Sequence, residues 1–185
     1  MLAAGGPGAV GVLALQGDFE AHGAVLGELG ASVREVRVAA DLEGLGALVL
    51  PGGESTTMML GIEREVLAEP LRELCTRVPV LATCAGMILL DRDHLNVLDM
   101  RCERNAFGRQ VRSFEGDVTL AGFEAPFHAV FIRAPWVAEH ASDITVLASV
   151  AEHPVAVSAG RVTAVAFHPE LIGETRLHRR LLEQL

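Results

Sequence analysis

The chain has 185 residues, a length that suits one domain, and half of them are hydrophobic, which is enough for a sizeable core. Its formal net charge of −9 argues against nucleic acid or an anionic membrane surface as the main partner. No apolar run in the sequence reaches the roughly 20 residues that a membrane-spanning helix requires.

The composition also excludes several kinds of catalysis. All fifteen basic residues other than histidine are arginines, and the chain has no tyrosine. Without lysine, the chain has no Schiff-base amine, no Ser-Lys dyad and no lysine P-loop. Its reactive groups are therefore cysteine, histidine, carboxylates and hydroxyls, and we expect neither a cofactor nor a metal.

The cysteines and the N-terminus suggest where the protein resides. Cys75, Cys84 and Cys102 are odd in number and match no disulfide or metal-binding spacing, which predicts a reducing, cytoplasmic location. Residues 1–8 are rich in glycine and alanine and contain no basic residue, unlike a secretory signal. We expect a flexible leader over residues 1–8 and a single domain over residues 9–185.

The first half of the chain alternates strand patterns with helix patterns. The apolar run 8–15 is typical of a strand buried on both faces, and residues 19–29 show helical spacing that Gly30 ends. Ser55 or Thr56 is a candidate cap for a second helix. The remaining predictions here are strands at 32–38, 47–50 and 78–83 and a helix at 85–90. Such alternation predicts a parallel α/β sheet.

The second half has short strand patterns separated by turn signals. The predicted strands cover residues 117–120, 127–133, 144–150, 154–158 and 162–167. An amphipathic helix over residues 175–185 closes the chain. We expect these later strands to extend the same sheet in antiparallel fashion.

Cys84 is the first candidate for chemistry, because it lies between a predicted buried strand and a predicted helix. A strand-to-helix turn projects its side chain above the sheet edge, and small neighbours permit the tight turn. The helix N-terminus favours a thiolate, and its free amides, beginning at Ala85, can bind a developing oxyanion. The alternative is a buried, inert cysteine, which is how we interpret Cys75 and Cys102.

His168 and Glu170 flank Pro169 at the end of the last predicted strand. If strand geometry persists, both side chains point to one face, so the carboxylate orients the imidazole and the imidazole takes the thiol proton. The alternative is a solvated surface turn. Catalytic groups of open α/β sheets cluster beyond strand C-termini, so the pairing with Cys84 strengthens the catalytic interpretation.

Other polar residues carry weaker signals. The two glycines in residues 51–57 (PGGESTT) allow a ligand to approach the backbone, although on local context a plain turn with a helix cap is the favoured interpretation. The arginines of residues 103–110, which include Arg104, either hold a carboxylate or face water. Arg133 ends an apolar strand, which favours a functional or ion-paired role. The remaining histidines have no ligand-like grouping and are interpreted as surface or capping residues: His22, His94, His128, His140, His153 and His178.

Six stretches run in one order along nearly the whole chain: 11–22 (GVLALQGDFEAH), 50–58 (LPGGESTTM), 83–90 (TCAGMILL), 103–110 (ERNAFGRQ), 131–135 (FIRAP) and 167–171 (FHPEL). Together they resemble the class I (triad) glutamine amidotransferases. More narrowly, they resemble the glutaminase subunit of pyridoxal phosphate synthase, the PdxT/SNO family. The Cys and His-Pro-Glu pair indicates only the broad class, whereas the LQGD, GGESTT and NAFGRQ runs are far more specific.

The resemblance implies a fold and an activity. The fold is a flavodoxin-like three-layer α/β/α sandwich. The activity is hydrolysis of L-glutamine to L-glutamate and ammonia, which passes to a synthase subunit for pyridoxal phosphate (vitamin B6) biosynthesis. The implied assembly is a ring of synthase subunits decorated by glutaminase subunits.

The resemblance also implies residue roles. Cys84 is the nucleophile, His168 the base and then the acid, and Glu170 the residue that orients His168. The amides of Gly53 and Ala85 form the oxyanion hole. The implied contacts to glutamine come from Gly53, Glu54, Ser55, Arg104, Ile132 and Arg133. The implied partner contact is Gln16-Gly17, and the Gly52-Gly53 peptide is expected to reorient when the partner binds.

Two features depart from the family pattern. Ala82 stands where the family usually has glycine, and its methyl group strains the turn if that position needs a positive φ. The stretch between Leu90 and Arg104 looks shorter than in the family. Neither departure removes a catalytic group, but both bear on efficiency and on coupling to the partner.

Other functions remain open on the sequence alone. A glutaminase that serves a different synthase, such as one in histidine biosynthesis, would have the same triad, and the copurifying synthase would discriminate. A docking subunit with disabled catalysis would leave its thiol unreactive toward a glutamine-analogue electrophile. A free-standing cysteine hydrolase is a weaker alternative.

Overall fold

The computed structural model describes residues 8–107 and 113–185, so the predicted leader lies outside it except for Gly8. Within these residues a seven-stranded sheet has the order β2-β1-β3-β4-β11-β10-β9. Its strands are β1 (Ala9–Leu13), β2 (Val33–Val36), β3 (Leu45–Leu50), β4 (Val80–Thr83), β9 (Thr145–Val150), β10 (His153–Ala159) and β11 (Val162–Val165). The strands from β2 to β11 in this order pair in parallel, and β10 pairs antiparallel with β11 and β9.

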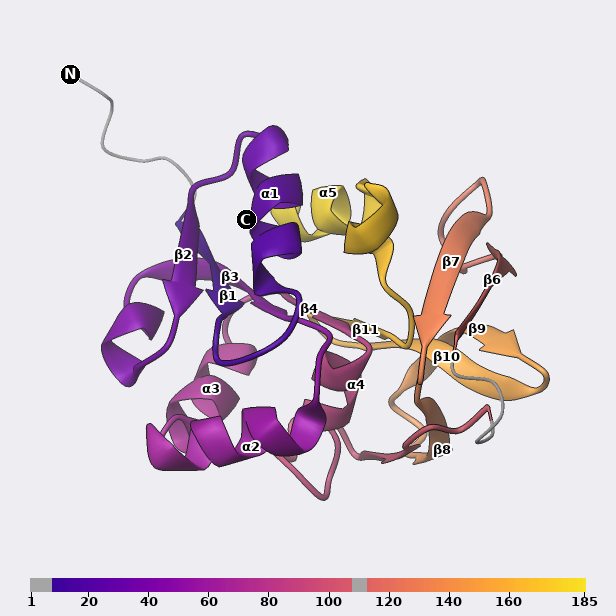
Figure 1. Cartoon of the computed structure of the whole chain (residues 1–185), viewed down its shortest axis with the longest axis horizontal. Helices are drawn as coiled ribbons and strands as arrows, with labels where there is room; N and C mark the ends of the chain where they lie inside the picture. Colours follow the sequence, from indigo (N-terminus) through magenta and orange to yellow (C-terminus); the bar gives the residue numbers. More distant parts are fainter. Residues whose placement is uncertain (1–7, 108–112) are drawn as a thin grey trace.

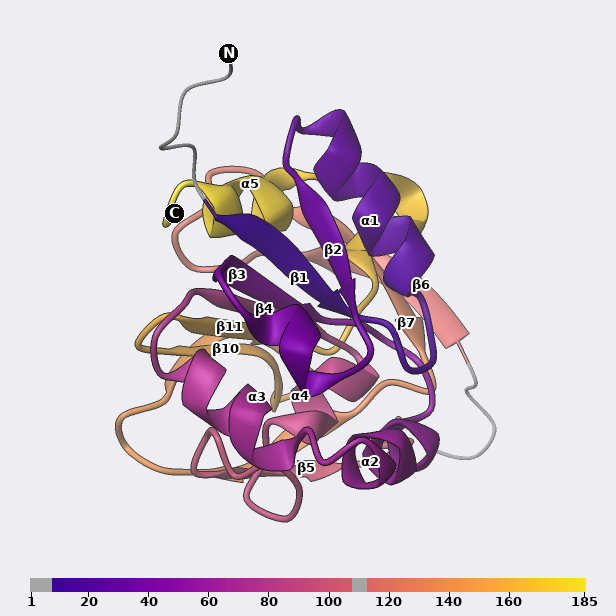
Figure 2. The ribbon, with the colours of Figure 1, turned by 90° about the vertical axis from the view of Figure 1, so that its left-hand side faces the viewer.

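Helices cover both faces of this sheet (Figures 1 and 2). One face carries α1 (Phe19–Glu28) and α5 (Arg176–Leu182), and the other carries α2 (Ser55–Arg64), α3 (Ala68–Cys75) and α4 (Ala85–Leu89). Two short 3-10 helices are η1 (Ala39–Leu42) and η2 (Pro169–Ile172). The order of the parallel strands is that of flavodoxin-like folds, so the predicted three-layer α/β/α sandwich is confirmed. None of the helices described has the length and apolarity needed to cross a membrane.

Four further strands in the described residues form two small sheets. β5 (Met100–Glu103) pairs with β8 (Trp136–His140), and β6 (Ser113–Val118) pairs with β7 (Phe127–Ile132). The predicted antiparallel extension is therefore right for β9 and β10 and wrong for β6 and β7. The β6–β7 pair buries only every second residue, because one of its faces is solvated, and it stands beside the main sheet (Figure 1).

An aromatic cluster joins the β6–β7 pair to the end of β11. The ring centroids of Phe131 and Phe167 lie 5.7 Å apart, and Phe131 also stacks on Phe114. Next to this cluster, the His168 amide donates to the Val130 carbonyl at 2.9 Å. The segment that follows β11 is thereby held against β7.

The N-terminus of α2 shows a cap that the sequence did not predict. Glu54, rather than Ser55 or Thr56, is the capping residue, and its carboxylate accepts hydrogen bonds from the amides of Thr56 and Thr57. The side chain of Glu54 is long enough to fold back onto these free amides. The predicted end of α1 is confirmed, since Gly30 has a φ of +81°.

The turn between β4 and α4 is built from small residues. Ala82 is fully buried inside β4, and the positive φ of this turn belongs to Cys84, so the strain expected at Ala82 is absent. A Cβ atom placed on Gly86 would lie 2.0 Å from the carbonyl oxygen of Leu50. Glycine at this position therefore lets α4 pack directly on the backbone of β3.

This contact predicts the stability of two matched glycine variants. Gly86→Ala should lower the free energy of unfolding by about 3 kcal/mol, because the new methyl group must displace the backbone of β3. Gly27→Ala should raise it by about 1 kcal/mol, because Gly27 is an exposed helical residue with open space at its Cβ position. Urea denaturation measures both, and equal stabilities would contradict the assigned packing.

Candidate active site

A pocket of about 420 Å³ lies beyond the carboxyl ends of β1, β3, β4 and β11, the usual place for a site in an open α/β sheet. Its lining includes every predicted site residue except Glu170: Gly53, Glu54, Ser55, Cys84, Ala85, Arg104, Ile132, Arg133 and His168. The lining also includes residues that were not predicted as site residues: Gln16, Asp18, Ile88, Asn105 and Leu171.

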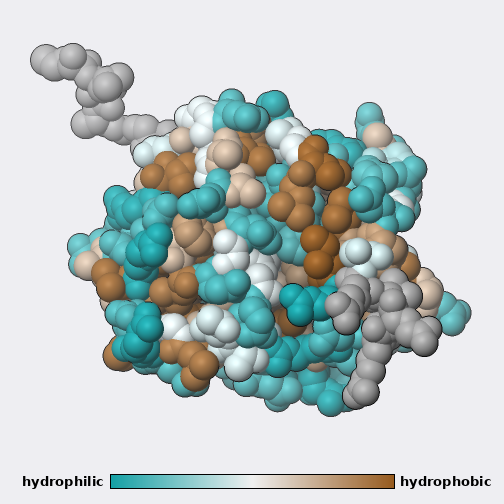
Figure 3. All heavy atoms as spheres, viewed as in Figure 1, coloured by the Kyte–Doolittle hydropathy of each residue, from teal (hydrophilic) through white to brown (hydrophobic). Residues whose placement is uncertain are grey.

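The mouth of the pocket is apolar on one side. Ile132 and Leu171, which line the pocket, are 37% and 45% exposed, and Ile172 is 43% exposed. Figure 3 shows apolar side chains gathered on this face beside α5, toward β7. Exposed apolar side chains at the rim of a polar pocket are typical of an interaction surface.

Cys84 occupies the strand-to-helix turn in a strained conformation. Its φ of 47° and ψ of −108° lie outside the ordinary regions for a non-glycine residue. The Cys84 amide donates to the Val165 carbonyl at 2.8 Å, which holds the turn against β11. Its Sγ atom lies 3.7 Å from the Ile132 carbonyl oxygen, and the Ala85 amide beside it is the first of α4.

His168 and Glu170 meet as predicted, but not for the predicted reason. Glu170 lies in η2 rather than in a continued strand, and its Oε1 atom is 2.7 Å from His168 Nδ1. Burial disfavours the charged imidazole, but interactions with Cys84 and Glu170 outweigh burial and raise the pKa of His168 to about 10. The surroundings of His168 therefore favour its protonated form.

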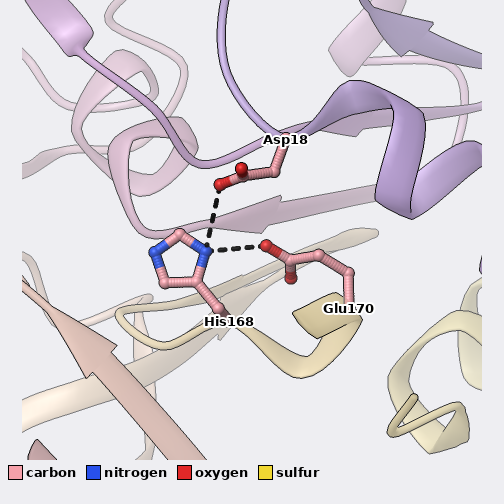
Figure 4. A group of neighbouring side chains, drawn as sticks. All are labelled: Asp18, His168 and Glu170. Atoms are coloured by element: carbon pink, nitrogen blue, oxygen red, sulfur yellow. Dashed lines mark hydrogen bonds and ion pairs between the residues drawn. The ribbon is translucent and has the colours of Figure 1, made fainter. Parts of the chain in front are cut away.

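Asp18 provides a second carboxylate to the same imidazole, a contact that the sequence did not predict. Figure 4 shows both carboxylates directed at one nitrogen, with Asp18 Oδ2 at 3.4 Å from His168 Nδ1. The three side chains offer ligand atoms within 4.8 Å of one another. Because both carboxylates face the same N–H, they orient the imidazole. That these three residues bind no metal stays a prediction.

The loop after β1 fixes the backbone of the Gly52-Gly53 turn. The Gly52 carbonyl accepts a hydrogen bond from the Asp18 amide at 3.0 Å, and Gln16 Oε1 accepts one from the Glu54 amide at 2.6 Å. A Cβ atom on Gly52 would lie 2.3 Å from His168 Cε1, and one on Gly53 would lie 2.4 Å from Gln16 Oε1. Both glycines are therefore required for close packing.

Charged groups of both signs line one wall of the pocket. The guanidinium of Arg104 donates to Ser55 and Thr56 and lies 3.5 Å from Glu54. Hydrogen bonds from Thr57 and Thr56, together with the charge of Arg104, hold the pKa of Glu54 below its usual value. A fixed carboxylate and a fixed guanidinium can each bind one charge of a zwitterion.

The opposite side of the pocket carries Ile132 and Arg133. Arg133 is exposed, has a φ of 44° and forms no ion pair with the residues that the structure describes. Asn105, which also lines the pocket, has a positive φ of 49°. Non-glycine residues with positive φ thus gather around the pocket. Arg109 and Gln110 of the predicted motif lie outside the described residues.

Two of the histidines interpreted as surface or capping residues are in the core. His22 and His178 are fully buried, and their rings hydrogen-bond to each other at 2.8 Å. His128, by contrast, is exposed as expected. The signal for His22 was its helical spacing from the buried residues Val25 and Leu26, which places it on the inner face of α1.

Comparisons with known proteins identify the family of this chain. The profile of the SNO glutamine amidotransferase family matches residues 12–185. A pyridoxal 5'-phosphate synthase subunit PdxT from Mycolicibacterium vanbaalenii is 49% identical over 95% of this chain and 97% of the relative. One from Frankia alni is 50% identical over 94% of this chain and 93% of the relative.

Solved structures extend the agreement to the fold. A crystal structure of a glutamine amidotransferase is 44% identical, with a TM-score of 0.89 over 96% of this chain and 98% of that chain. The structure of PurLQS from Thermotoga maritima, 18% identical, shares the fold with a TM-score of 0.71 over 96% of this chain and 98% of that chain. The resemblance seen in the sequence is confirmed, and the chain belongs to the SNO glutamine amidotransferase family.

Proposed function

We propose that this chain is the glutaminase subunit of a pyridoxal 5'-phosphate synthase. It hydrolyses L-glutamine to L-glutamate and ammonia and supplies the ammonia to a partner synthase subunit. The observation that carries this proposal is the strained Cys84 beside an imidazole held by Glu170 at 2.7 Å, in one pocket. Membership of the family and the PdxT relatives support it.

The charged wall of the pocket binds the α-amino acid end of glutamine. The carboxylate of Glu54 takes the substrate ammonium group, and the guanidinium of Arg104 takes or positions its carboxylate. Ser55 and the Gly53 backbone complete this side, and Ile132 and Arg133 close the other. The side-chain amide of glutamine then reaches Cys84.

The first half of the reaction forms a thioester. The thiolate of Cys84 attacks the amide carbon, and the carbonyl oxygen becomes an oxyanion held by the amides of Gly53 and Ala85. His168, carrying the thiol proton, donates it to the leaving nitrogen as the C–N bond breaks. Ammonia and a glutamyl thioester on Cys84 result.

The second half releases glutamate. His168 takes a proton from a water molecule as that water attacks the thioester. His168 then gives the proton to the Cys84 sulfur as the C–S bond breaks. Glu170 and Asp18 keep the imidazole oriented in both halves, because both face its Nδ1 atom. Ammonia must stay unprotonated, so it passes inside the complex rather than through bulk water.

The partner completes the oxyanion hole. A trans peptide directs its N–H opposite to its carbonyl, and the Asp18 amide holds the Gly52 carbonyl at 3.0 Å. Contact of the synthase with Gln16-Gly17 reorients the Gly52-Gly53 peptide, which directs the Gly53 amide at the oxyanion. The apolar rim formed by Ile132 and Leu171 belongs to the same docking surface.

The proposal extends to assembly and location. Residues 9–185 act as one glutaminase domain, and such subunits decorate a ring of synthase subunits. The three cysteines are free, and a thiolate nucleophile works in a reducing compartment, so we place the protein in the cytoplasm.

Replacing the nucleophile should abolish hydrolysis. Cys84→Ala should reduce glutamate release to background, because no other described thiol faces the pocket. Cys75→Ala is the matched control and should keep its activity, since Cys75 lies on α3 and burial raises its pKa to about 12. The measurement is glutamate release by the complex, with peptide mapping after labelling by a glutamine-analogue electrophile. Residual glutamine hydrolysis by Cys84→Ala would contradict the proposed mechanism.

The alkaline limb of kcat/KM should report the loss of the His168 proton. Glu170 helps to raise this pKa, so Glu170→Gln should move the limb to lower pH and reduce kcat on the order of 10²-fold. Asp18→Asn should have a smaller effect, because Asp18 lies 3.4 Å rather than 2.7 Å from Nδ1. An unchanged limb in Glu170→Gln would contradict the role assigned to this carboxylate.

The synthase subunit should activate the glutaminase. Adding it should raise the rate of glutamate release at least tenfold, equivalent to about 1.4 kcal/mol of barrier, because the Gly53 amide becomes an oxyanion donor. An unrelated synthase, such as one of histidine biosynthesis, is the control and should leave the rate unchanged. If neither synthase produces glutamate release, the chain is a docking subunit without catalysis. If only the control synthase activates it, the chain serves that other synthase.

A further inference from the structure

A second buried polar group lies behind the triad, and the mechanism above does not use it. His22 lies on α1 and His178 on α5, the two helices that share one face of the sheet (Figure 2). Neither side chain is exposed, and neither lines the pocket. Burying two imidazoles costs free energy unless their nitrogens are hydrogen-bonded, so their contacts indicate what they do.

His22 contacts one triad residue, Glu170, and Thr83, the residue before another. Its Nε2 atom lies 3.0 Å from Thr83 Oγ1, the residue before Cys84. The same Nε2 atom lies 3.4 Å from Glu170 Oε2, the oxygen that does not face His168. On its other side, His22 Nδ1 lies 2.8 Å from His178 Nε2.

Both imidazoles are neutral near pH 7. Burial first, then the neighbouring His178 and His168, holds the pKa of His22 well below its usual value. Burial lowers the pKa of His178 to about 4, against the smaller opposing effects of Glu174. Each ring therefore carries one N–H, and the pair has two proton arrangements.

The charge on Glu170 decides between these arrangements. In one, the N–H of His22 is on Nε2 and points at Glu170 Oε2 and Thr83 Oγ1, while His178 Nε2–H donates to His22 Nδ1. In the other, His178 carries its proton on Nδ1, toward the Glu174 backbone, and His22 presents a lone pair to the carboxylate. Neither His178 Nδ1 nor Glu170 Oε2 has a hydrogen-bond partner of good geometry among the described residues, and His22 Nε2 faces Glu170 Oε2 as a potential donor at 3.4 Å. A buried carboxylate oxygen requires a donor, so the first arrangement holds.

We propose that His22 is a positioning residue of the glutaminase reaction. Its Nε2–H fixes two side chains, those of Glu170 and Thr83. Glu170 orients His168, and Thr83 precedes Cys84. His178 in turn fixes the tautomer of His22. The inference rests on the proposed function and adds a buried support to the same site. His22 acts through Glu170 and touches no part of the pocket, so it governs kcat rather than substrate affinity.

The groups that set the pH dependence face the triad from several elements. Glu170 faces His168 at the end of β11 and His22 on α1, and His168 also faces Cys84 and Asp18. Loss of the His22 donor frees Glu170 to rotate, so the carboxylate stabilises the His168 imidazolium less. The alkaline limb of kcat/KM then moves to lower pH, which a merely structural role would not cause.

The test compares His22→Phe with His22→Gln in the complex with the synthase. The phenylalanine fills the space without a donor, whereas the glutamine amide returns an N–H near the Nε2 position. We expect His22→Phe to lower kcat about tenfold, to change KM less than about twofold and to shift the alkaline limb. His22→Gln should recover most of kcat and the position of the limb.

Two further measurements keep the test decisive if His22→Phe does not fold. Nitrogen-15 chemical shifts of the wild-type imidazoles should show the proton of His22 on Nε2, and a bare Nε2 would overturn the proposal. In a double-mutant cycle, a His22 change should cost little more in a Glu170→Gln background, because both act through one carboxylate. Losses of activity that add in the double-mutant cycle would also overturn the proposal. So would a His22→Phe variant whose kcat equals that of an active wild-type complex. A wild-type complex without glutaminase activity would instead reject the proposed function.

Discussion

The hydrogen bond from the Cys84 amide to the Val165 carbonyl is the interaction on which the site depends. It holds a residue at a φ of 47°, a conformation that costs on the order of 1–3 kcal/mol and persists only when its surroundings enforce it. The same bond places the end of β4 against the end of β11. Because His168 lies three residues after the end of β11, this backbone contact brings Cys84 and the His168 imidazole into a common pocket.

The charged side chains of the pocket are also held in fixed positions. The carboxylate of Glu54 caps α2 while it faces Arg104, so its position is set by two helix amides rather than by a flexible side chain. The imidazole of His168 is similarly held, by carboxylates from the loop after β1 and from η2. Groups fixed before the substrate arrives need little reorganisation during the reaction, which is the condition for electrostatic catalysis.

Local patterns in the sequence predicted the parts of the site that depend on neighbours in the chain. The apolar strand, the small residues and the helix pattern around Cys84 define a tight turn wherever they occur. The contact between His168 and Glu170 was predicted from strand alternation, but β11 ends at Val165 and Pro169 starts the helical turn η2. His168 is the N-cap of η2, outside the turn itself, so its ring can still face the Glu170 carboxylate.

Not all contacts between distant segments were beyond prediction. Gln16 and Asp18 lie in the loop after β1, so the rule that sites gather beyond strand ends was sufficient to find them, although Asp18 was not predicted. Leu171 had no such signal. The short strands β5 and β8 were also not predicted, because each is stabilised by pairing with the other. His22 and His178 were misplaced because their burial depends on two helices that meet only in the folded chain.

Helix α1 connects the segment expected to sense the partner with the support behind the triad. Asp18 occupies the N-cap position of α1, its amide holds the Gly52 carbonyl, and its own carbonyl accepts a hydrogen bond from the His22 amide at 3.2 Å. One helical turn, a rise of about 6 Å, therefore separates the residue that fixes the glycine peptide from the imidazole that faces Glu170. In the mechanism that we propose, a movement of this turn that frees the Gly52 carbonyl also acts on Glu170 through His22. The proposal thus couples formation of the oxyanion hole and alignment of His168 through the first turn of one helix.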